Sequence, residues 1–437
     1  MTKTKIPNLR WLIVGLLFLS SVINYIDRQT LSILARTIQN DLRMSDLDYA
    51  GVVQLFLIAY TVTYLFAGRV TDWLGTRASL AAFIIWWSVA NMLTGLSRSA
   101  FSLGAFRFLL GIGEPGNYTA SPKAVSEWFP PKERGLAIGI YTTGATIGAT
   151  IAPPLIALLA TSYGWRAAFV TTGALGLLWV IPWLWLYHTP REHPRITDAE
   201  LATVEANDAA AAARAEADGT ASEINNLTER GRWAMLLGRR ETWLLLLSRV
   251  LTDPVWYFYL FWFPKYLSDQ RGLSLLEVGR IAWIVYLAAD IGSLLGGWAS
   301  GALIKRGMNT ISARKRVMIV AACLLPLSPL VALAPSVYAA LFVASIAAFA
   351  HLAWQVTLGV LIVDLYPQRL IATVFGVVAA GSGFGGLVST GIVGRLVTDY
   401  SYTPVFVLMG VLHPLALVLI LKVRNTDPTR KMTVQAV

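Results

Sequence analysis

Long apolar segments fill most of the chain, and each is bounded by charged residues or by Pro and Gly. In helical form, a stretch of about 20 apolar residues spans the hydrocarbon core of a bilayer. The segments that meet this requirement are 11–35, 49–70, 79–97, 100–122, 135–160, 166–187, 241–267, 277–303, 316–335, 338–362, 370–397 and 403–423. The pattern predicts an all-α membrane protein with 12 transmembrane helices in two six-helix bundles.

One long polar stretch, residues 188–240, interrupts the apolar pattern near the middle of the chain. It divides the chain into a predicted N-terminal six-helix bundle at 1–187, a cytoplasmic linker loop at 188–240, and a C-terminal six-helix bundle with a short cytoplasmic tail at 241–437. Thr197 and Glu200 have the spacing of a capping box ahead of an Ala-rich run, which predicts short surface helices. A plain linker and a regulatory or partner-binding segment both fit this composition.

The two predicted bundles share an internal repeat at a fixed offset of 237 residues. The matched positions are Glu127 and Asp364, Phe129 and Tyr366, Pro130 and Pro367, Gly139 and Gly376, Gly144 and Gly381, Gly148 and Gly385, Tyr163 and Tyr400, and Phe169 and Phe406. Two related membrane bundles are the arrangement that lets a central site open to either side of the membrane. The repeat therefore predicts two pseudo-symmetric halves and transport by alternating access.

Composition narrows the class of protein further, since 56% of the residues are hydrophobic and only 14% are charged. Too little chain remains outside the apolar segments for a soluble catalytic domain, so we expect no enzyme. The sequence lacks a G-x-x-x-x-G-K-[ST] phosphate loop, which disfavours transport driven by ATP from this chain alone. Cys323 is the single cysteine, which excludes a disulfide framework and a cysteine-based metal site. We expect no cofactor and no metal.

Basic residues distinguish the two sides of the membrane. The connectors on one side carry Lys3, Lys5, Arg10, Arg69, Arg77, Lys132, Arg134 and the basic residues within 305–316 and 422–431. The connectors on the other side carry Asp41, Asp46, Asp48, Asp269 and Asp399. Because basic connectors stay in the cytoplasm, both termini are predicted to be cytoplasmic.

The first apolar run, from Trp11, is expected to remain as a span rather than act as a signal peptide. The net charge of +11 is thus a topology signal, and no nucleic-acid partner is expected.

Four ionisable residues lie inside predicted spans of the first half: Asp27 and Arg28 in the first, and Arg107 and Glu114 in the fourth. Each costs roughly 2.5 to 3.5 kcal/mol on insertion, so each needs a partner, a water-filled cavity or a function. Two arginines facing a cavity suit a carboxylate, because a guanidinium binds it in bidentate geometry. Two carboxylates there can take up and release protons. The alternative is internal pairing of Asp27 or Glu114 with Arg107.

The second half carries His351 at the position that the repeat aligns with Glu114, and Trp354 and Gln355 follow in the same span. Hydrogen-bond donors and a flat ring suit the hydroxyls and the ring face of a sugar. These three residues are therefore predicted to contact substrate. For His351, a packing or hydrogen-bonding role inside the bundle is an open alternative.

Three further ionisable residues of the second half carry less specific signals. Arg249 and Asp253, four residues apart in the seventh span, are predicted to form a local ion pair. Asp290 in the eighth span is either a hydrogen-bonding residue between helices or a second titrating site.

Gly68, Asp72, Gly75 and Arg77 occupy the connector between the second and third spans in the pattern G-x-x-x-D-x-x-G-x-R, which resembles the signature loop of the major facilitator superfamily. The glycines allow a tight turn and close helix approach, and the charged pair can cap helix ends or pair across the bundle interface. Such contacts would hold one side of the protein shut; the alternative is a simple topology determinant. In the second half Gly301 stands where the acid would be, which predicts a weaker latch there.

A closer resemblance rests on Asn24-Tyr25-Ile26-Asp27-Arg28, on the segment from Arg107 to Glu114, on Glu127-Trp-Phe-Pro-Pro-Lys-Glu-Arg134 and on Asp253-Pro-Val-Trp-Tyr-Phe-Tyr259. These segments resemble the anion:cation symporter branch of that superfamily and its bacterial hexuronate transporters. The resemblance implies Asp27 and Glu114 as proton-coupling acids and Arg28 and Arg107 near the substrate carboxylate. It also implies that Tyr25 and Tyr60 line the sugar site.

The function that the resemblance implies is proton-coupled import of a hexuronate, such as glucuronate or galacturonate, by a monomer in the bacterial inner membrane. The expected partners are this organic anion, protons and the lipid bilayer. A carrier for an aldonate, an aldarate or another organic anion is the alternative within the class. A passive facilitator and a non-transporting sensor of sugar acids are further alternatives; a sensor would need a signalling domain that the polar segments do not offer.

Overall fold

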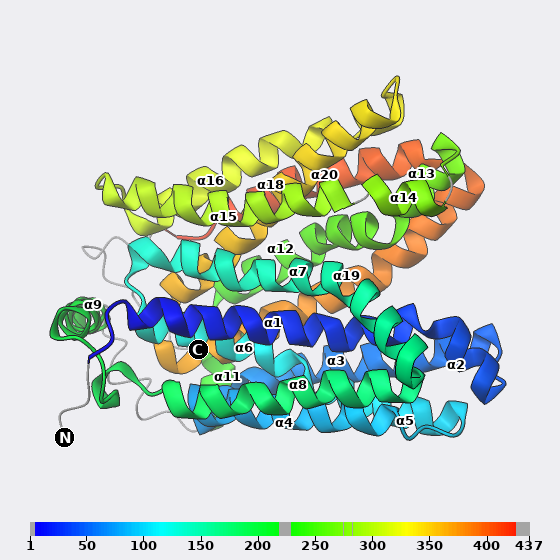
Figure 1. The fold of residues 1–437 in the computed structure, drawn as a ribbon. Helices are drawn as coiled ribbons and strands as arrows, with labels where there is room; N and C mark the ends of the chain where they lie inside the picture. The colour runs from blue at the N-terminus through cyan, green and yellow to red at the C-terminus, as the bar shows by residue number, and fades with distance from the viewer. Residues whose placement is uncertain (1–4, 218–228, 274, 282, 425–437) are drawn as a thin grey trace.

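A computed structural model describes residues 5–217, 229–273, 275–281 and 283–424 of the protein. Within these ranges the regular structure is entirely helical, and the long helices run side by side (Figure 1). The first half contains α1 (Leu9–Ile33), α2 (Ala35–Leu42), α3 (Asp46–Leu74), α4 (Thr76–Thr94), α5 (Ala100–Gly113), α6 (Pro115–Trp128), α7 (Pro131–Tyr163) and α8 (Trp165–Leu186). The second half contains α12 (Arg240–Tyr257), η2 (Phe258–Trp262), α13 (Phe263–Arg271), α14 (Leu275–Ile281), α15 (Trp283–Lys305), α16 (Thr310–Leu324), η3 (Leu325–Leu327), α17 (Leu330–Leu333), α18 (Val337–Leu365), η4 (Gln368–Leu370), α19 (Ile371–Asp399) and α20 (Tyr402–Leu421).

In the described part of the chain, nine helical segments are long and apolar enough to cross a membrane. Three more crossings complete the predicted twelve: α4, the consecutive pair α5 and α6, and the series α12, η2 and α13. The fourth span is divided because Pro115, which has no backbone N–H, follows Glu114 at the start of α6. The seventh span contains the π-helical turn η2 four residues after Pro254. The predicted all-α fold of two six-helix bundles is confirmed.

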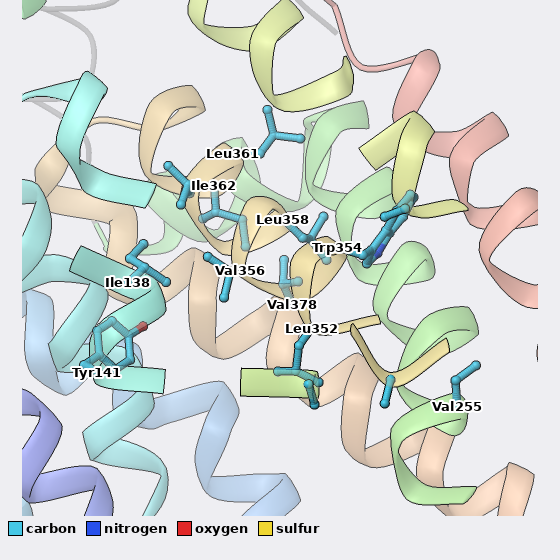
Figure 2. Packing of buried hydrophobic residues seen from close by; sticks show 14 of the residues in the cluster. Ile138, Tyr141, Val255, Leu352, Trp354, Val356, Leu358, Leu361, Ile362 and Val378 are labelled. Atoms are coloured by element: carbon cyan, nitrogen blue, oxygen red, sulfur yellow. The ribbon is translucent and has the colours of Figure 1, made fainter. Parts of the chain in front are cut away.

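Helix packing separates the two bundles. In the first, α1 packs on α7, α3 on α5, and α4 on α8; in the second, α15 packs on α18, α12 on α19, and α16 on α18. The bundles meet along two helix pairs, α7 with α15 and α3 with α19. The core of the second bundle surrounds α18, whose Val356, Leu358 and Ile362 are buried. Figure 2 shows this helix between α7, which carries Ile138 and Tyr141, and the helices of its own bundle.

The two bundles are in close contact at the end of the molecule where α1 begins and α20 ends, which we call the terminal face. A Cβ atom at Gly68 would lie 1.9 Å from the carbonyl oxygen of Ala372, so α3 and α19 touch backbone to backbone. A Cβ atom at Gly135 would lie 2.4 Å from the carbonyl oxygen of Gly297, which gives the same result for α7 and α15. Only glycine permits this approach, and the terminal face is therefore closed.

The polar stretch between the bundles contains η1 (Pro190–Glu192) and the helices α9 (Asp198–Ala217), of 20 residues, and α11 (Glu229–Gly238), of 10 residues. The expected capping contact is present, with the backbone N–H of Glu200 donating to the Thr197 hydroxyl over 3.3 Å. The Glu200 carboxylate also accepts the backbone N–H of Leu9 at 3.2 Å. The Thr197 hydroxyl thus caps α9 and the Glu200 carboxylate caps the first transmembrane helix, which fixes the linker to the terminal face.

Candidate functional site

The central feature of the first bundle is an ion pair between α1 and the break that separates α5 from α6. Arg28 donates from Nε and Nη2 to one oxygen of Glu114, Oε2, at 2.8 and 2.6 Å. The Glu114 side chain is fully buried, while 25% of the Arg28 side chain is exposed. The second oxygen, Oε1, has no hydrogen-bond partner in the described part of the chain. The pair is therefore buried on the carboxylate side and accessible on the guanidinium side.

Aromatic rings surround the Arg28 guanidinium. Its Cζ atom lies 4.6 Å from the ring centre of Tyr60, 5.0 Å from that of Tyr25 and 5.8 Å from that of Phe56. Such contacts hold a cation in place without neutralising it. Tyr25 and Tyr60, which the resemblance implies at the sugar site, thus lie beside Arg28, and a tyrosine hydroxyl can hydrogen-bond a polar ligand. Tyr60 already shares a 2.8 Å hydrogen bond with Tyr64.

Arg107 of α5 lies beside Arg28 and is almost completely buried. Its Nη2 donates to the backbone carbonyl of Arg28 at 3.3 Å, and its Cζ lies 5.3 Å from the Phe56 ring centre. Neither Nε nor Nη1 finds a hydrogen-bond partner among the described residues. The alternative in which Arg107 pairs with Glu114 is therefore wrong for this conformation. An unpaired buried guanidinium next to a paired one is a site for an additional anion. We call Arg28, Arg107, Glu114, Tyr25 and Tyr60 the arginine cluster.

Asp27 points away from the arginine cluster into the interior of the first bundle. Its side chain is fully buried, and Oδ1 accepts a 2.6 Å hydrogen bond from Nδ2 of Asn91 on α4. Asn91 also donates to Thr172 of α8 at 2.8 Å. No ion pair joins Asp27 to an arginine in the described structure, so the alternative of Asp27 pairing with Arg107 is also wrong. The two acids therefore lie in different environments, with Glu114 paired to a cation and Asp27 bonded to a neutral amide.

In the second bundle, His351 lies inside the helix packing. It is buried, its Nδ1 is 3.2 Å from Nε2 of His413 on α20, and its ring stacks on Trp256 at 5.9 Å. Trp354 is likewise fully buried, and its ring meets that of His413 edge-on at 5.4 Å. Figure 2 places Trp354 on the side of α18 away from Tyr141 of α7. In this conformation both side chains face the interior of their own bundle, which is the packing role that the sequence left open for His351; contact of either residue with substrate stays a prediction.

Gln355, the third residue predicted in this span, is partly exposed and connects α18 to α12. It accepts a hydrogen bond from Arg249 and donates one to Asp253. Arg249 and Asp253 form the expected ion pair at 3.2 Å. Asp290 of α15 is half-buried, and its Oδ1 has no hydrogen-bond partner among the residues that the structure describes. Gln355 and its two charged neighbours thus form one polar network between α12 and α18.

Asp72 forms the predicted contact across the terminal face. Its Oδ2 accepts the backbone N–H and the hydroxyl of Thr373, in the first turn of α19, at 2.8 and 2.6 Å. Its Oδ1 accepts from Lys123 at 2.9 Å. Arg77 does not cross the interface but donates to the carbonyl of Leu184 in its own bundle. Gly75, at φ +77°, makes the turn between α3 and α4.

A second latch, which the sequence analysis missed, closes the other interface. Asp364 at the end of α18 accepts from Arg134 of α7 at 2.9 Å and from Arg314 of α16 at 3.0 Å. Arg314 is fully buried and also donates to the carbonyl of Pro131 at 2.6 Å. The expectation of a weaker latch in the second half is wrong, because the acid is supplied by α18 rather than by the connector between α15 and α16. The repeat pair of Glu127 with Asp364 was the available signal.

Comparison with known proteins places these observations in a family. The model described as Major Facilitator Superfamily matches residues 17–313 and 307–436. The chain is 32% identical to the hexuronate transporter of Escherichia coli (strain K12), over 97% of this chain and 96% of that protein. It is 32% identical to the galacturonate transporter of Dickeya chrysanthemi, over 74% of this chain and 90% of the relative.

Solved structures with the same fold include sugar symporters. The proton:xylose symporter XylE superposes with a TM-score of 0.72 at 16% identity, covering 96% of this chain and 97% of that one. The E. coli fucose:proton symporter FucP gives a TM-score of 0.68 at 12% identity, covering 94% and 98%. At these identities the likeness concerns the fold alone.

Proposed function

The chain belongs to the major facilitator superfamily, and from this premise we propose that it is a proton-coupled symporter importing a hexuronate such as glucuronate or galacturonate. A coupled anion transporter needs a positively charged side chain that binds the substrate carboxylate and an acidic side chain that gains and loses a proton in each cycle. The arginine cluster supplies both kinds of group. The observation that carries the proposal is the pairing of Arg28 with Glu114 beside the unpaired guanidinium of Arg107.

Competition for Arg28 is the coupling mechanism that we propose. While Glu114 is ionised, it holds the Arg28 guanidinium, and a substrate carboxylate would add a second negative charge to a buried site. Once Glu114 is protonated, Arg28 loses its counter-ion, and the substrate carboxylate takes that place between Arg28 and Arg107. The proton and the anion together add no net charge to the buried site, which avoids the large cost of burying either alone.

Asp27 serves in this proposal as a second proton-binding acid, one helical residue away from Arg28. Its neutral partner Asn91 keeps it hydrogen-bonded without compensating its charge. Protonation of Asp27 would therefore remove an uncompensated negative charge from the interior of the first bundle. The sugar hydroxyls would meet Tyr25 and Tyr60 from the first bundle and Gln355 from the second.

The closed terminal face indicates which side of the membrane the site faces. Because this face carries most basic connectors, we propose that it is cytoplasmic, which makes the present conformation outward-facing. Opening inward would break the contacts of Asp72 with Thr373 and of Asp364 with Arg134. The halves at 1–187 and 241–437 would rock about the site, with 188–240 as their linker, and the transporter would act as a monomer in the bacterial inner membrane.

Uptake of labelled glucuronate into proteoliposomes, with and without an inward proton gradient, tests the proposal. Accumulation above the external concentration that collapses with a protonophore is the expected result. Galacturonate should compete and glucose should not. Equal uptake with and without the gradient would replace the symporter with a passive facilitator.

A second candidate substrate class is favoured by other relatives. The chain is 29% identical to the D-galactonate transporter of Escherichia coli O6:H1 over 91% of both chains. An aldonate carries the same carboxylate on an open chain, so it suits the same two arginines. Stronger competition by galactonate than by glucuronate would keep the mechanism and change the substrate.

A further inference from the structure

A cavity of about 300 Å³ lies on the terminal face, where the first turn of α7 meets the end of α15. From α7 it is lined by Lys132, Glu133 and Leu136. From α15 and the residue that follows it, the lining residues are Trp298, Gly301, Ala302, Lys305 and Arg306. The cavity is therefore shared between the two bundles, and none of its lining residues belongs to the arginine cluster.

The rim of this cavity carries an uncompensated positive charge. Lys132, Lys305 and Arg306 are exposed and form no ion pair within the described part of the chain. The carboxylate of Glu133 is already engaged by Arg10, whose Nε lies 3.2 Å from Oε2. Three cations thus line one opening, and the acid in the same lining, Glu133, is paired with Arg10.

Below the cationic rim, α15 presents an exposed apolar stripe. Ile291, Leu295 and Trp298 are spaced at helical intervals and are 44, 46 and 59% exposed. The opposite side of the same helix packs on α7 through Gly297. The stripe therefore faces the hydrocarbon region, and the three cations lie where it ends at the membrane surface.

We propose that this cavity binds an anionic phospholipid, whose phosphate lies among Lys132, Lys305 and Arg306 and whose acyl chain follows the stripe past Trp298. A cationic rim alone would suit any phosphate. Its continuity with an exposed apolar stripe favours an amphipathic ligand, and basic recesses between transmembrane helices suit anionic headgroups. The indole of Trp298 is placed at the boundary where such rings anchor.

Binding there would link the two bundles. Lys132 belongs to the first bundle, and Lys305 and Arg306 belong to the second. At this point the bundles touch, since a Cβ atom at Gly301 would lie 2.3 Å from the carbonyl oxygen of Lys132. Separation of α7 from α15 would divide the three cations, so the lipid binds the closed terminal face better and shifts the equilibrium toward it.

Lipid binding to the purified full-length protein, measured by native mass spectrometry, tests the site without reference to sugar transport. The variant combines Lys132→Gln, Lys305→Gln and Arg306→Gln. Its matched control combines Arg316→Gln, Lys422→Gln and Arg424→Gln, which removes three exposed cations from the same face outside the cavity. Phosphatidylglycerol should bind the wild type and the control alike, and the cavity variant at least about tenfold more weakly, with phosphatidylcholine weak throughout. Equal losses in both variants, or no loss in the cavity variant, would overturn the proposal.

Two further measurements distinguish lost lipid binding from a folding defect, and a lipid phosphate from free phosphate. A charge-conserving variant, Lys132→Arg with Lys305→Arg and Arg306→Lys, should retain the lipid; loss of binding there contradicts an electrostatic site. Inorganic phosphate at millimolar concentration should not displace phosphatidylglycerol, because it lacks the acyl chain. Full displacement would make this a site for free phosphate and would reject the lipid.

Discussion

The two bundles are built from one repeated unit, yet matched positions in them carry different side chains with different surroundings. Glu114 of the first bundle is a buried carboxylate held by Arg28. His351, at the position 237 residues later, is a buried ring between Trp256 and His413. The same comparison holds about two turns away in the fourth and tenth spans, where Arg107 of the first bundle corresponds to Ala344 of the second.

This difference teaches how a pseudo-symmetric fold can carry an asymmetric function. The backbone supplies two equivalent halves that can rock about a shared centre. In the proposed mechanism, the charges that exchange with a proton and an anionic substrate lie in only one half. The other half presents polar neighbours such as Gln355 and fills the equivalent space with aromatic packing. We therefore expect mutations to separate into coupling effects in the first bundle and packing effects in the second.

Glu114→Gln should give the largest functional effect. An inward gradient of one pH unit supports up to about tenfold accumulation per coupled proton. The variant cannot exchange a proton at this position, so accumulation should fall to the external concentration while exchange of labelled for unlabelled substrate persists. Proteoliposome uptake and counterflow measure the two activities separately. Undiminished accumulation would remove Glu114 from the coupling mechanism.

Arg107→Ala gives the first bundle the residue that the second bundle has at the matched position, Ala344. Loss of a charge-assisted hydrogen bond to the carboxylate, worth about 1.5 to 3 kcal/mol, should weaken substrate binding roughly 10- to 150-fold. The substrate-free protein should not lose stability, because the substitution removes a buried guanidinium that is largely unpaired. Isothermal titration calorimetry and the midpoint of thermal unfolding measure these quantities. Normal affinity, or a large fall in the midpoint, would assign Arg107 a structural role instead.

The repeat pair of Asp364 and Glu127 allows a matched test of the terminal face. Asp364 accepts from two arginines, one in each bundle, whereas Glu127 accepts from Thr76 and Tyr187 in its own bundle. Asp364→Asn leaves buried arginines unpaired and should weaken the closed face by about 3 to 5 kcal/mol. Glu127→Gln loses only hydrogen-bond strength, about 1 kcal/mol.

For both variants, the measured quantity is the rate at which a maleimide reacts with a thiol placed in the closed interface. Ser126 is buried, and its carbonyl accepts a 3.0 Å hydrogen bond from Gln368 of the second bundle. In a Cys323→Ala background, the thiol introduced by Ser126→Cys should react faster with a maleimide in the Asp364→Asn variant and almost unchanged in Glu127→Gln. Equal maleimide reaction rates in the two variants would show that Asp364 does not stabilise the closed interface more than Glu127 does.

The sequence predicted the fold well because the signals that define it are local. A bilayer requires long apolar helices, so their number follows from hydropathy. The division of the fourth span at Pro115 was not predicted. The charged residues of the arginine cluster were identifiable by the cost of placing charges in a membrane. Their pairing was not identifiable: the sequence analysis considered only Arg107 as a partner for Glu114, whereas the structure pairs Glu114 with Arg28, because the pairing depends on how α1 packs against α5 and α6.

Neutral and distant partners explain the remaining differences between expectation and structure. Asn91 carries no charge, so nothing in the third span pointed to it as the partner of Asp27. Trp354 lies in α18, which is apolar on almost every side, and such a helix gives no periodicity from which its central face can be read. Arg134 and Asp364 are 230 residues apart, so their pairing follows from how the bundles dock.

His351→Gln should give the smallest effect and is the sharpest check on the comparison between bundles. Glutamine keeps a hydrogen-bonding group near His413 but removes a ring, so we expect a loss of stability of about 1 to 3 kcal/mol from imperfect packing. Substrate affinity and proton-driven accumulation should both stay within about threefold of the wild type, since an effect of 0.6 kcal/mol or less is expected on a group that does not touch substrate. Uptake, counterflow and thermal unfolding, measured as for Glu114→Gln, make the two positions directly comparable. Loss of accumulation with intact counterflow would mean that the second bundle also carries a coupling group, and the asymmetry proposed for the two halves would be wrong.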